Sequence, residues 1–306
     1  MKRGAIVEAN GSPAFYGRRL SKSLSHWKQV AKSIANPILG LRSKPLALDM
    51  TMNPLRFACL LIASLFLGSC TTTPITGSSA FNLFSPADDC ELGTEAYSQF
   101  TADATLVTSN SGNKGEWKQT VEKVMADLAS VAEDQGYSYE VKLIDDDGTV
   151  NAWCLPCGKM AVYTGILPIC EDATGLAVVM GHEIGHAIAR HGTQRMSLDT
   201  AVQAALTLAT SDEDLQSLGV LAYEYGAALP FGRSHELEAD HIGLVLMARA
   251  GYDPREAIVF WERMESLGGA SGTPEWLSTH PSHETRAEEL QALMPQVMGT
   301  YLANKP

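Results

Sequence analysis

Residues 180–187 read Met180-Gly181-His182-Glu183-Ile184-Gly185-His186-Ala187. The two histidines stand four residues apart, and residues at this spacing lie on the same face of an α-helix, so both imidazoles can reach one metal ion. Zinc binds neutral imidazole nitrogens and keeps one position open for water in catalytic sites. Glu183 would lie beside that water and could take its proton. The stretch therefore predicts a helix that carries a hydrolytic zinc site, with one Zn²⁺ per chain.

A third ligand would separate this interpretation from a chance match of the pattern. Residues 234–243 contain two carboxylates one helical turn apart, Glu236 and Asp240. Glu236 can complete the coordination begun by the two histidines. Asp240 can accept the free ring N–H of a ligand histidine, which we assign to His182. The alternative is a solvated acidic face, which we would favour if the histidine pair did not precede it.

The charge of the chain is unevenly divided. Residues 1–69 carry ten Lys and Arg against two Asp and Glu, so 13 of the 23 basic and 33 of the 35 acidic residues lie in the remainder. An acidic globular part gives no footprint for nucleic acid. The 306 residues, 45% of them apolar, suffice for one large domain or two small ones.

A short apolar run follows one arginine in residues 52–69, which predicts a secretory signal peptide. The run is shorter than the roughly 20 residues that a transmembrane helix needs. Leu67-Gly68-Ser69-Cys70 resembles a bacterial lipobox, which implies lipidation of Cys70 and a membrane anchor. Because Thr71 is not an aspartate, we expect the periplasmic face of the outer membrane, with residues 70–85 as a tether.

Residues 1–51 precede this signal sequence, although a signal sequence should begin near the amino terminus. We interpret them as an over-long start or disordered leader, with translation beginning at Met52 or Met50. The competing interpretation is an organellar transit peptide followed by a membrane anchor, because the leader is rich in Arg and Ser and poor in acidic residues.

Hydrophobic periodicity predicts a mostly helical remainder. Helices are expected over residues 86–100, 116–133, 173–191, 197–209, 213–228, 234–250, 253–264 and 282–293, with Gly192 ending the metal helix. Strands are expected over residues 137–144, 150–153 and 159–165. The helices over residues 197–209 and 213–228 are apolar nearly all round, which suggests burial or a lid near the cleft.

The strand directly before the metal helix contains Lys159, Met160, Ala161, Val162 and Tyr163. We assign it as an edge strand that pairs with an extended substrate backbone, because strand addition supplies main-chain hydrogen bonds. The alternative is an ordinary internal strand.

Four cysteines lie beyond the leader and Cys70: Cys90, Cys154, Cys157 and Cys170. The spacing of Cys154 and Cys157 allows a redox pair or a metal knuckle. No second pair with zinc-finger spacing exists, so a local disulfide or unpaired thiols are the simpler interpretation. The pairing stays open.

Six elements in order resemble the zinc metallopeptidase family of the CAAX prenyl proteases, HtpX and the mitochondrial Oma-type proteases. They are Pro74-Ile75-Thr76-Gly77, Glu91-Leu92-Gly93, residues 151–165, residues 182–186, residues 236–243, and His280-Pro281 followed by Arg286. Within the family the chain is most similar to the periplasmic lipoprotein branch, LoiP-like and β-barrel assembly-enhancing protease-like.

The resemblance implies zinc held by His182, His186 and Glu236, with Glu183 as the general base. It further suggests that His280 can become a fourth ligand that keeps the enzyme latent, and that Arg286 lies near the cleft and stabilises the oxyanion. Two departures stand out: Cys157 occupies a position where relatives usually have glycine, and no helical repeat domain is expected before the chain ends at Pro306.

Together these features predict an α+β, mostly helical, zincin-like (gluzincin) domain over residues 86–306, with a small sheet beside the metal helix. The expected function is a zinc metalloendopeptidase of the bacterial cell envelope that cleaves misfolded or unassembled envelope polypeptides. The alternatives are a periplasmic chaperone or scaffold with a latent zinc site, and a redox protein built on Cys154 and Cys157. His191, His235, His241 and His283 receive no role.

Overall fold

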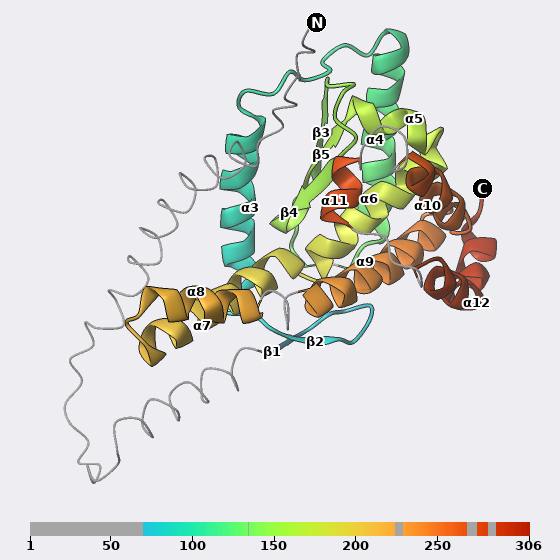
Figure 1. Ribbon diagram of the computed structural model, residues 1–306. Helices are drawn as coiled ribbons and strands as arrows, with labels where there is room; N and C mark the ends of the chain where they lie inside the picture. The colour runs from blue at the N-terminus through green and yellow to red at the C-terminus, as the bar shows by residue number, and fades with distance from the viewer. Residues whose placement is uncertain (1–69, 134, 224–228, 268–273, 281–285) are drawn as a thin grey trace, which may run out of the picture. The chain divides into compact units, whose positions relative to one another are not determined.

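Two long helices, α6 (Ala173–Ile188) and α9 (Leu229–Arg249), pack along each other and carry the predicted metal ligands (Figure 1). The computed structural model describes residues 70–133, 135–223, 229–267, 274–280 and 286–306, all within the unit Leu60–Pro306. Helix α6 begins at Asp172, whose carboxylate accepts hydrogen bonds from the N–H groups of Thr174 and Gly175. All but three of its residues are buried, as in a core helix.

The backbones of α6 and α9 approach each other at glycines. A Cβ added to Gly185 of α6 would lie 2.6 Å from the carbonyl oxygen of Ala239 in α9. A Cβ added to Gly243 of α9 would lie 3.0 Å from the carbonyl carbon of Gly181 in α6. Because no side chain separates the two helices there, the histidines of α6 face the carboxylates of α9 across a short gap.

A three-stranded sheet lies beside α6, with the strand order β3-β5-β4. Strand β5 (Lys159–Tyr163) runs parallel to β3 (Glu140–Ile144) and antiparallel to β4 (Ala152–Leu155). The prediction that β5 is an edge strand is therefore wrong, because both of its sides are paired and its first four residues are buried. The strand at the edge next to α6 is β4, whose outer side pairs with no other strand of the described residues.

Residues 70–85, expected to form a tether, instead fold onto the domain. Strands β1 (Cys70–Thr72) and β2 (Ser79–Phe81) form an antiparallel hairpin. The side chain of Asn82 donates a hydrogen bond of 2.9 Å to Thr193 Oγ1, and both residues are buried. This segment therefore packs against α7 (His191–Ala209) and reaches the neighbourhood of the metal helix.

A disulfide joins Cys90 to Cys157 and so links α3 (Pro86–Thr101) to the single turn η1 (Pro156–Gly158). Cys157 has a φ of 67°, in the left-handed region that favours glycine. The pairing, which the sequence left open, is thus Cys90 with Cys157, while Cys154 and the buried Cys170 are free thiols. The alternative of a Cys154–Cys157 redox pair is excluded, because Cys157 is bonded to Cys90. Burial raises the pKa of the Cys154 thiol well above its usual value, which disfavours the nucleophilic thiolate.

The remaining elements are α4 (Gly112–Val131), η2 (Thr164–Ile166), α5 (Leu167–Cys170), α8 (Glu213–Tyr223), α10 (Glu256–Leu267), α11 (Glu275–Thr279) and α12 (Arg286–Asn304). Gly192 lies inside α7 rather than ending α6, because the chain turns at Arg190 with a left-handed φ of 61°. Of the two alternatives for α7 and α8, burial is wrong, because Leu208 is 75% exposed and Leu218 is 62% exposed; a lid near the cleft stays a prediction.

The apolar core joins α4, the sheet, α6, α9, α10 and α12 around Val124, Leu176, Phe260 and Trp276. The predicted fold class is confirmed: the chain is α+β and mostly helical, with a small sheet and a zincin-like arrangement of the metal helix. Within the described residues no single helix is long and apolar enough to cross a membrane, although residues 164–170 and 173–188 together meet the length and composition across a 120° bend.

Candidate metal centre

Four predicted residues converge at the contact between α6 and α9. His182, His186, Glu236 and His280 each contribute one ligand atom, and these atoms all lie within 4.8 Å of one another. The Nε2 atom of His182 lies 3.0 Å from Nε2 of His186 and 3.1 Å from Nδ1 of His280. The carboxylate of Glu236 lies 3.3 Å from Nε2 of His182 and 3.4 Å from Nε2 of His186. The site is enclosed, since even His186 and His280 expose only 12% of their side chains.

The chemistry of these donors fits a divalent cation. Three ring nitrogens that face one another at 3.0–3.1 Å cannot all be satisfied by hydrogen bonds among themselves, because each contact needs one donor and one acceptor. Imidazole nitrogens with one carboxylate are the ligands that zinc takes in catalytic sites. Any metal would be held by His182, His186 and Glu236, with His280 at a fourth position.

The carboxylate of Glu236 is ionised in this site. Burial acts to raise its pKa, but hydrogen bonds from His182, His186 and His280 outweigh burial and hold the pKa far below its usual range. Burial also acts to lower the pKa of His182, but contacts with Asp240 and Glu236 raise it to about 9. Burial lowers the pKa of His186 well below its usual value. The metal-free site therefore already holds negative charge and one basic imidazole.

Asp240 lies behind His182. Its Oδ1 atom is 2.8 Å from Nδ1 of His182, so the carboxylate can accept the ring N–H and leave Nε2 free for the metal. The guanidinium of Arg286 donates to the same carboxylate from Nε at 2.7 Å and from Nη2 at 2.8 Å. Burial acts to raise the pKa of Asp240, but Arg286 and His182 outweigh it and lower the pKa.

Arg286 lies behind the metal centre. Its side chain is 1% exposed, its guanidinium donates to Asp240, and its Cζ atom lies 3.5 Å from the ring centroid of Trp261. Its Nη1 atom makes no hydrogen bond among the described residues and lies 3.6 Å from the carboxylate of Glu236. Arg286 supports His182 through Asp240, and its predicted oxyanion role stays a prediction.

Glu183 projects from α6 beside the converging ligands and is 3% exposed. Its Oε1 atom accepts a hydrogen bond of 2.9 Å from the indole N–H of Trp276 in α11. The Nε2 atom of His280 lies 3.2 Å from the same oxygen, and Nδ1 of His280 lies 3.0 Å from Glu236. His280 therefore stands between the candidate base and the candidate third ligand.

Sequence reasoning missed two neighbours of this site. Trp276 lies in a stretch for which no helix is predicted, although it stands four residues before His280, a spacing that puts both on one side of a helical turn. His191 received no role, although its Nδ1 atom lies 2.8 Å from Nδ1 of His186. No helical spacing links the two histidines, because the chain turns at Arg190 between them.

Two other predicted sites lie apart from this centre or outside the described residues. Cys70 begins β1, and its lipidation stays a prediction. His283 and the expected start of the last helix at Ser282 fall outside the described residues, as do the leader and signal peptide in residues 1–69.

Comparison with known proteins places residues 113–294 in register with the sequence profile of Peptidase family M48. Mitochondrial metalloendopeptidase OMA1 of Schizosaccharomyces pombe is 38% identical over 178 residues, which cover 58% of this chain and 52% of that protein. Mitochondrial metalloendopeptidase OMA1 of Danio rerio is 34% identical over 261 residues, which cover 78% of this chain and 53% of that protein.

A bacterial protein also matches. Beta-barrel assembly-enhancing protease of Escherichia coli is 28% identical over 238 residues, which cover 74% of this chain and 47% of that protein. The chain thus spans about half the length of these three relatives. The predicted location at the periplasmic face of a bacterial outer membrane is contradicted, because the more similar relatives are mitochondrial proteins.

Proposed function

The chain belongs to peptidase family M48, and from this premise we propose that it acts as a zinc-dependent metalloendopeptidase. One observation carries the proposal: the ring nitrogens of His182 and His186 and the carboxylate of Glu236 meet from two helices, with Glu183 beside them. The names of the relatives support the same activity, since they describe metalloendopeptidases and a protease.

The protein's own residues would divide the work as follows. His182, His186 and Glu236 hold the ion, and Asp240 keeps the ring of His182 oriented by accepting its Nδ1–H. When bound, zinc would polarise the scissile carbonyl and lower the pKa of water toward about 7. Glu183 takes the proton from the attacking water and returns it to the leaving amine.

We propose that the resting enzyme is latent. The Nδ1 atom of His280 lies 3.1 Å from the metal-facing nitrogen of His182 and 3.0 Å from Glu236, so its ring takes the space that water needs. The same ring reaches Glu183 at 3.2 Å, and Trp276 donates to that carboxylate. His280 must therefore leave before water can bind between the ion and the base.

Extended polypeptides are the substrates that this architecture suits. Strand β4 lies at the sheet edge beside α6, and its outer side is free of other strands among the described residues. An extended segment could add to that edge through main-chain hydrogen bonds, which select for an unfolded backbone more than for sequence. We therefore propose misfolded or unassembled proteins as substrates, in a role of protein quality control.

Cleavage of casein by zinc-loaded protein tests this proposal. We expect slow cleavage by the wild type, none by Glu183→Gln with zinc content unchanged, and faster cleavage by His280→Ala. Glu262→Gln, which removes an exposed carboxylate from α10, serves as the matched control and should leave cleavage unchanged. Suppressed aggregation of a misfolded protein, without cleavage and unaltered by Glu183→Gln, would refute the peptidase and favour the chaperone.

A further inference from the structure

A second imidazole stands directly behind the ligand His186. His191, the first residue of α7, is 1% exposed. Its Nδ1 atom lies 2.8 Å from Nδ1 of His186, and its Nε2 atom lies 3.2 Å from Oε2 of Glu238. Its ring also stacks on that of His235, with the centroids 3.8 Å apart and the planes at 14°. The position of this ring is thus fixed from three directions.

The hydrogen bonds that run from His186 through His191 to Glu238 can take only one direction when His186 binds a metal. The Nε2 atom of His186 faces the other ligands, so it must offer its lone pair there, and the ring proton must stand on Nδ1. His191 then accepts this N–H at its own Nδ1, and its proton stands on Nε2. That second N–H points to Glu238, which accepts it. Each contact then has one donor and one acceptor.

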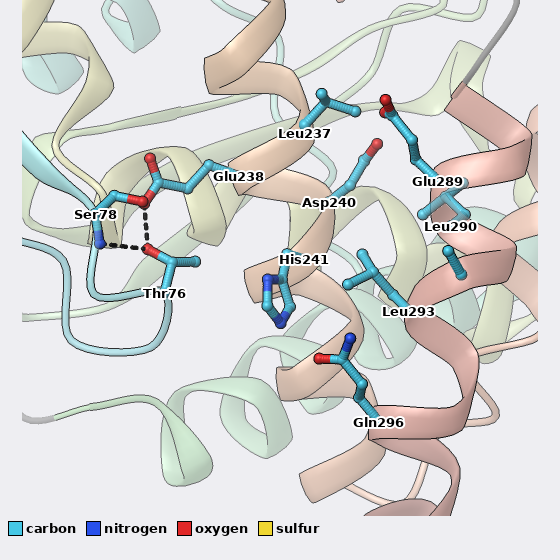
Figure 2. A pocket seen from close by; sticks show the side chains of 11 residues that line it. Thr76, Ser78, Leu237, Glu238, Asp240, His241, Glu289, Leu290, Leu293 and Gln296 are labelled. Atoms are coloured by element: carbon cyan, nitrogen blue, oxygen red, sulfur yellow. Dashed lines mark hydrogen bonds between the residues drawn. The ribbon is translucent and has the colours of Figure 1, made fainter.

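Glu238, the last residue of this hydrogen-bond series, is held in place by the β1–β2 hairpin. The hydroxyl of Thr76 donates to Oε1 of Glu238, and the N–H of Ser78 donates to the oxygen of Thr76 at 3.3 Å (Figure 2). Thr76 and Ser78 belong to the loop between β1 and β2, while Glu238 belongs to α9. Both oxygens of Glu238 are therefore engaged, one toward the metal centre and one toward the hairpin.

The two histidine ligands of α6 thus have different supports. His182 is supported directly by a carboxylate, because Asp240 lies 2.8 Å from its Nδ1 atom. His186 is supported at one remove, because an imidazole stands between it and Glu238. A partner that accepts the outer N–H of a ligand histidine fixes its tautomer and raises its basicity, and losing such a partner costs about 10–100-fold in metal affinity.

We propose that His191 and Glu238 are positioning residues for the metal ligand His186, and that the hairpin residue Thr76 holds Glu238 in place. This inference rests on the proposed metal site. It makes the first folded segment of the described chain part of the metal centre, although residues 70–85 supply no ligand. The same contacts could serve packing alone, so the test must measure metal binding apart from folding.

Three substitutions separate the parts of this arrangement. His191→Phe keeps a ring that can stack on His235 but removes both nitrogens. His191→Gln keeps one acceptor and one donor. Glu238→Gln keeps an acceptor for His191 but removes the negative charge. His241→Gln is the matched control, because it changes a half-buried histidine of α9 that makes no hydrogen bond to His186, His191 or Glu238 among the described residues.

The measurement is the zinc dissociation constant, from competition with a chromophoric chelator, together with the melting temperature of the metal-free protein. We expect His191→Phe to weaken zinc binding by about 10–100-fold. Glu238→Gln and His191→Gln should each weaken it less. Once His191 is Phe, adding Glu238→Gln should cause no further loss, because the link to His186 is already broken. His241→Gln should bind as the wild type does.

Cobalt substitution provides a second readout, since the visible absorption of bound Co²⁺ should change in His191→Phe and stay as in the wild type in His241→Gln. If the wild type binds zinc and all three variants bind it equally well, the inference fails while the proposed function stands. Independent, additive losses from His191→Phe and Glu238→Gln would also overturn it. A wild type that binds no zinc would refute the proposed function itself.

Discussion

Replacing Gly185 by alanine should damage the metal centre more than the fold. The added Cβ would lie 2.6 Å from the carbonyl oxygen of Ala239, whereas ordinary contact begins at 3.4 Å, so the backbones must separate by the difference of 0.8 Å. Neither contact atom can yield by turning a side chain, because the oxygen belongs to the helix backbone. Glu236 stands one turn before Ala239 and would move with it.

The effects on stability partly cancel. Overpacking costs about 1–3 kcal/mol, while alanine gains up to about 1 kcal/mol over glycine in a helix interior. We therefore expect the free energy of unfolding to fall by about 0–2 kcal/mol. Metal binding has no such compensation, because a ligand displaced from its partners is not replaced. Loss of a residue that orients a metal ligand costs about 10–100-fold in metal affinity, and we expect a similar fall in zinc affinity here.

A graded series makes this measurement sharp. A Cβ at Gly181 would meet α9 at 3.3 Å, and one at Gly299 in α12 would meet nothing within 4 Å. Zinc titration with a competing chelator, alongside urea unfolding of the metal-free protein, should rank the losses of affinity as Gly185→Ala, then Gly181→Ala, then none for Gly299→Ala. Wild-type zinc affinity in folded Gly185→Ala would show that helix spacing does not set the ligand geometry.

Three further predictions concern stability. Arg286→Ala leaves the buried carboxylate of Asp240 without its cation, so the free energy of unfolding should fall by about 3–5 kcal/mol, measured in urea. Substituting both Cys90 and Cys157 by serine should cost about 4 kcal/mol in the chain-entropy picture for 67 residues, and a reductant should lower the melting temperature of the wild type only. Hydrogen bonds from His191 and Thr76 outweigh burial and lower the pKa of Glu238 from 4.5 to about 2. Its stabilisation, at most about 3 kcal/mol, is thus present above pH 4.5 and lost as the pH falls toward 2, so metal-free wild type and Glu238→Gln should converge in acid.

The metal centre was the most predictable part of the chain because its residues follow helical spacing. His182 and His186 share a helix face, and Glu236 and Asp240 share another. The expectation that these two faces meet came from the metalloprotease motif and the family resemblance, since helical spacing alone does not bring two helices together. The support of His186 by His191 was not predictable in this way. It depends on the left-handed turn at Arg190, which brings His191 at the start of α7 against His186, and no periodicity encodes a turn of that kind.

The strands were predicted better than their partners. The strand predicted over residues 159–165 lies close to the observed β5, but strand order depends on which segments meet across long stretches of chain. The burial of β5 on both sides was readable from its continuous apolar run, which is typical of a strand with a parallel neighbour. The exposure of Leu208 and Leu218 could not be read in this way. An apolar composition does not show whether another element covers the helix.

His280 is tethered between two fixed points. Trp276, four residues earlier, is fully buried against Trp261, and Arg286, six residues later, is locked to Asp240. A rotation of the His280 ring would empty the fourth metal position while Trp276 and Arg286 keep their contacts. This movement would remove His280 from both Glu236 and Glu183 and leave the indole hydrogen bond to Glu183 in place. A withdrawal of α11 would empty the same position and would also remove the indole hydrogen bond from Glu183.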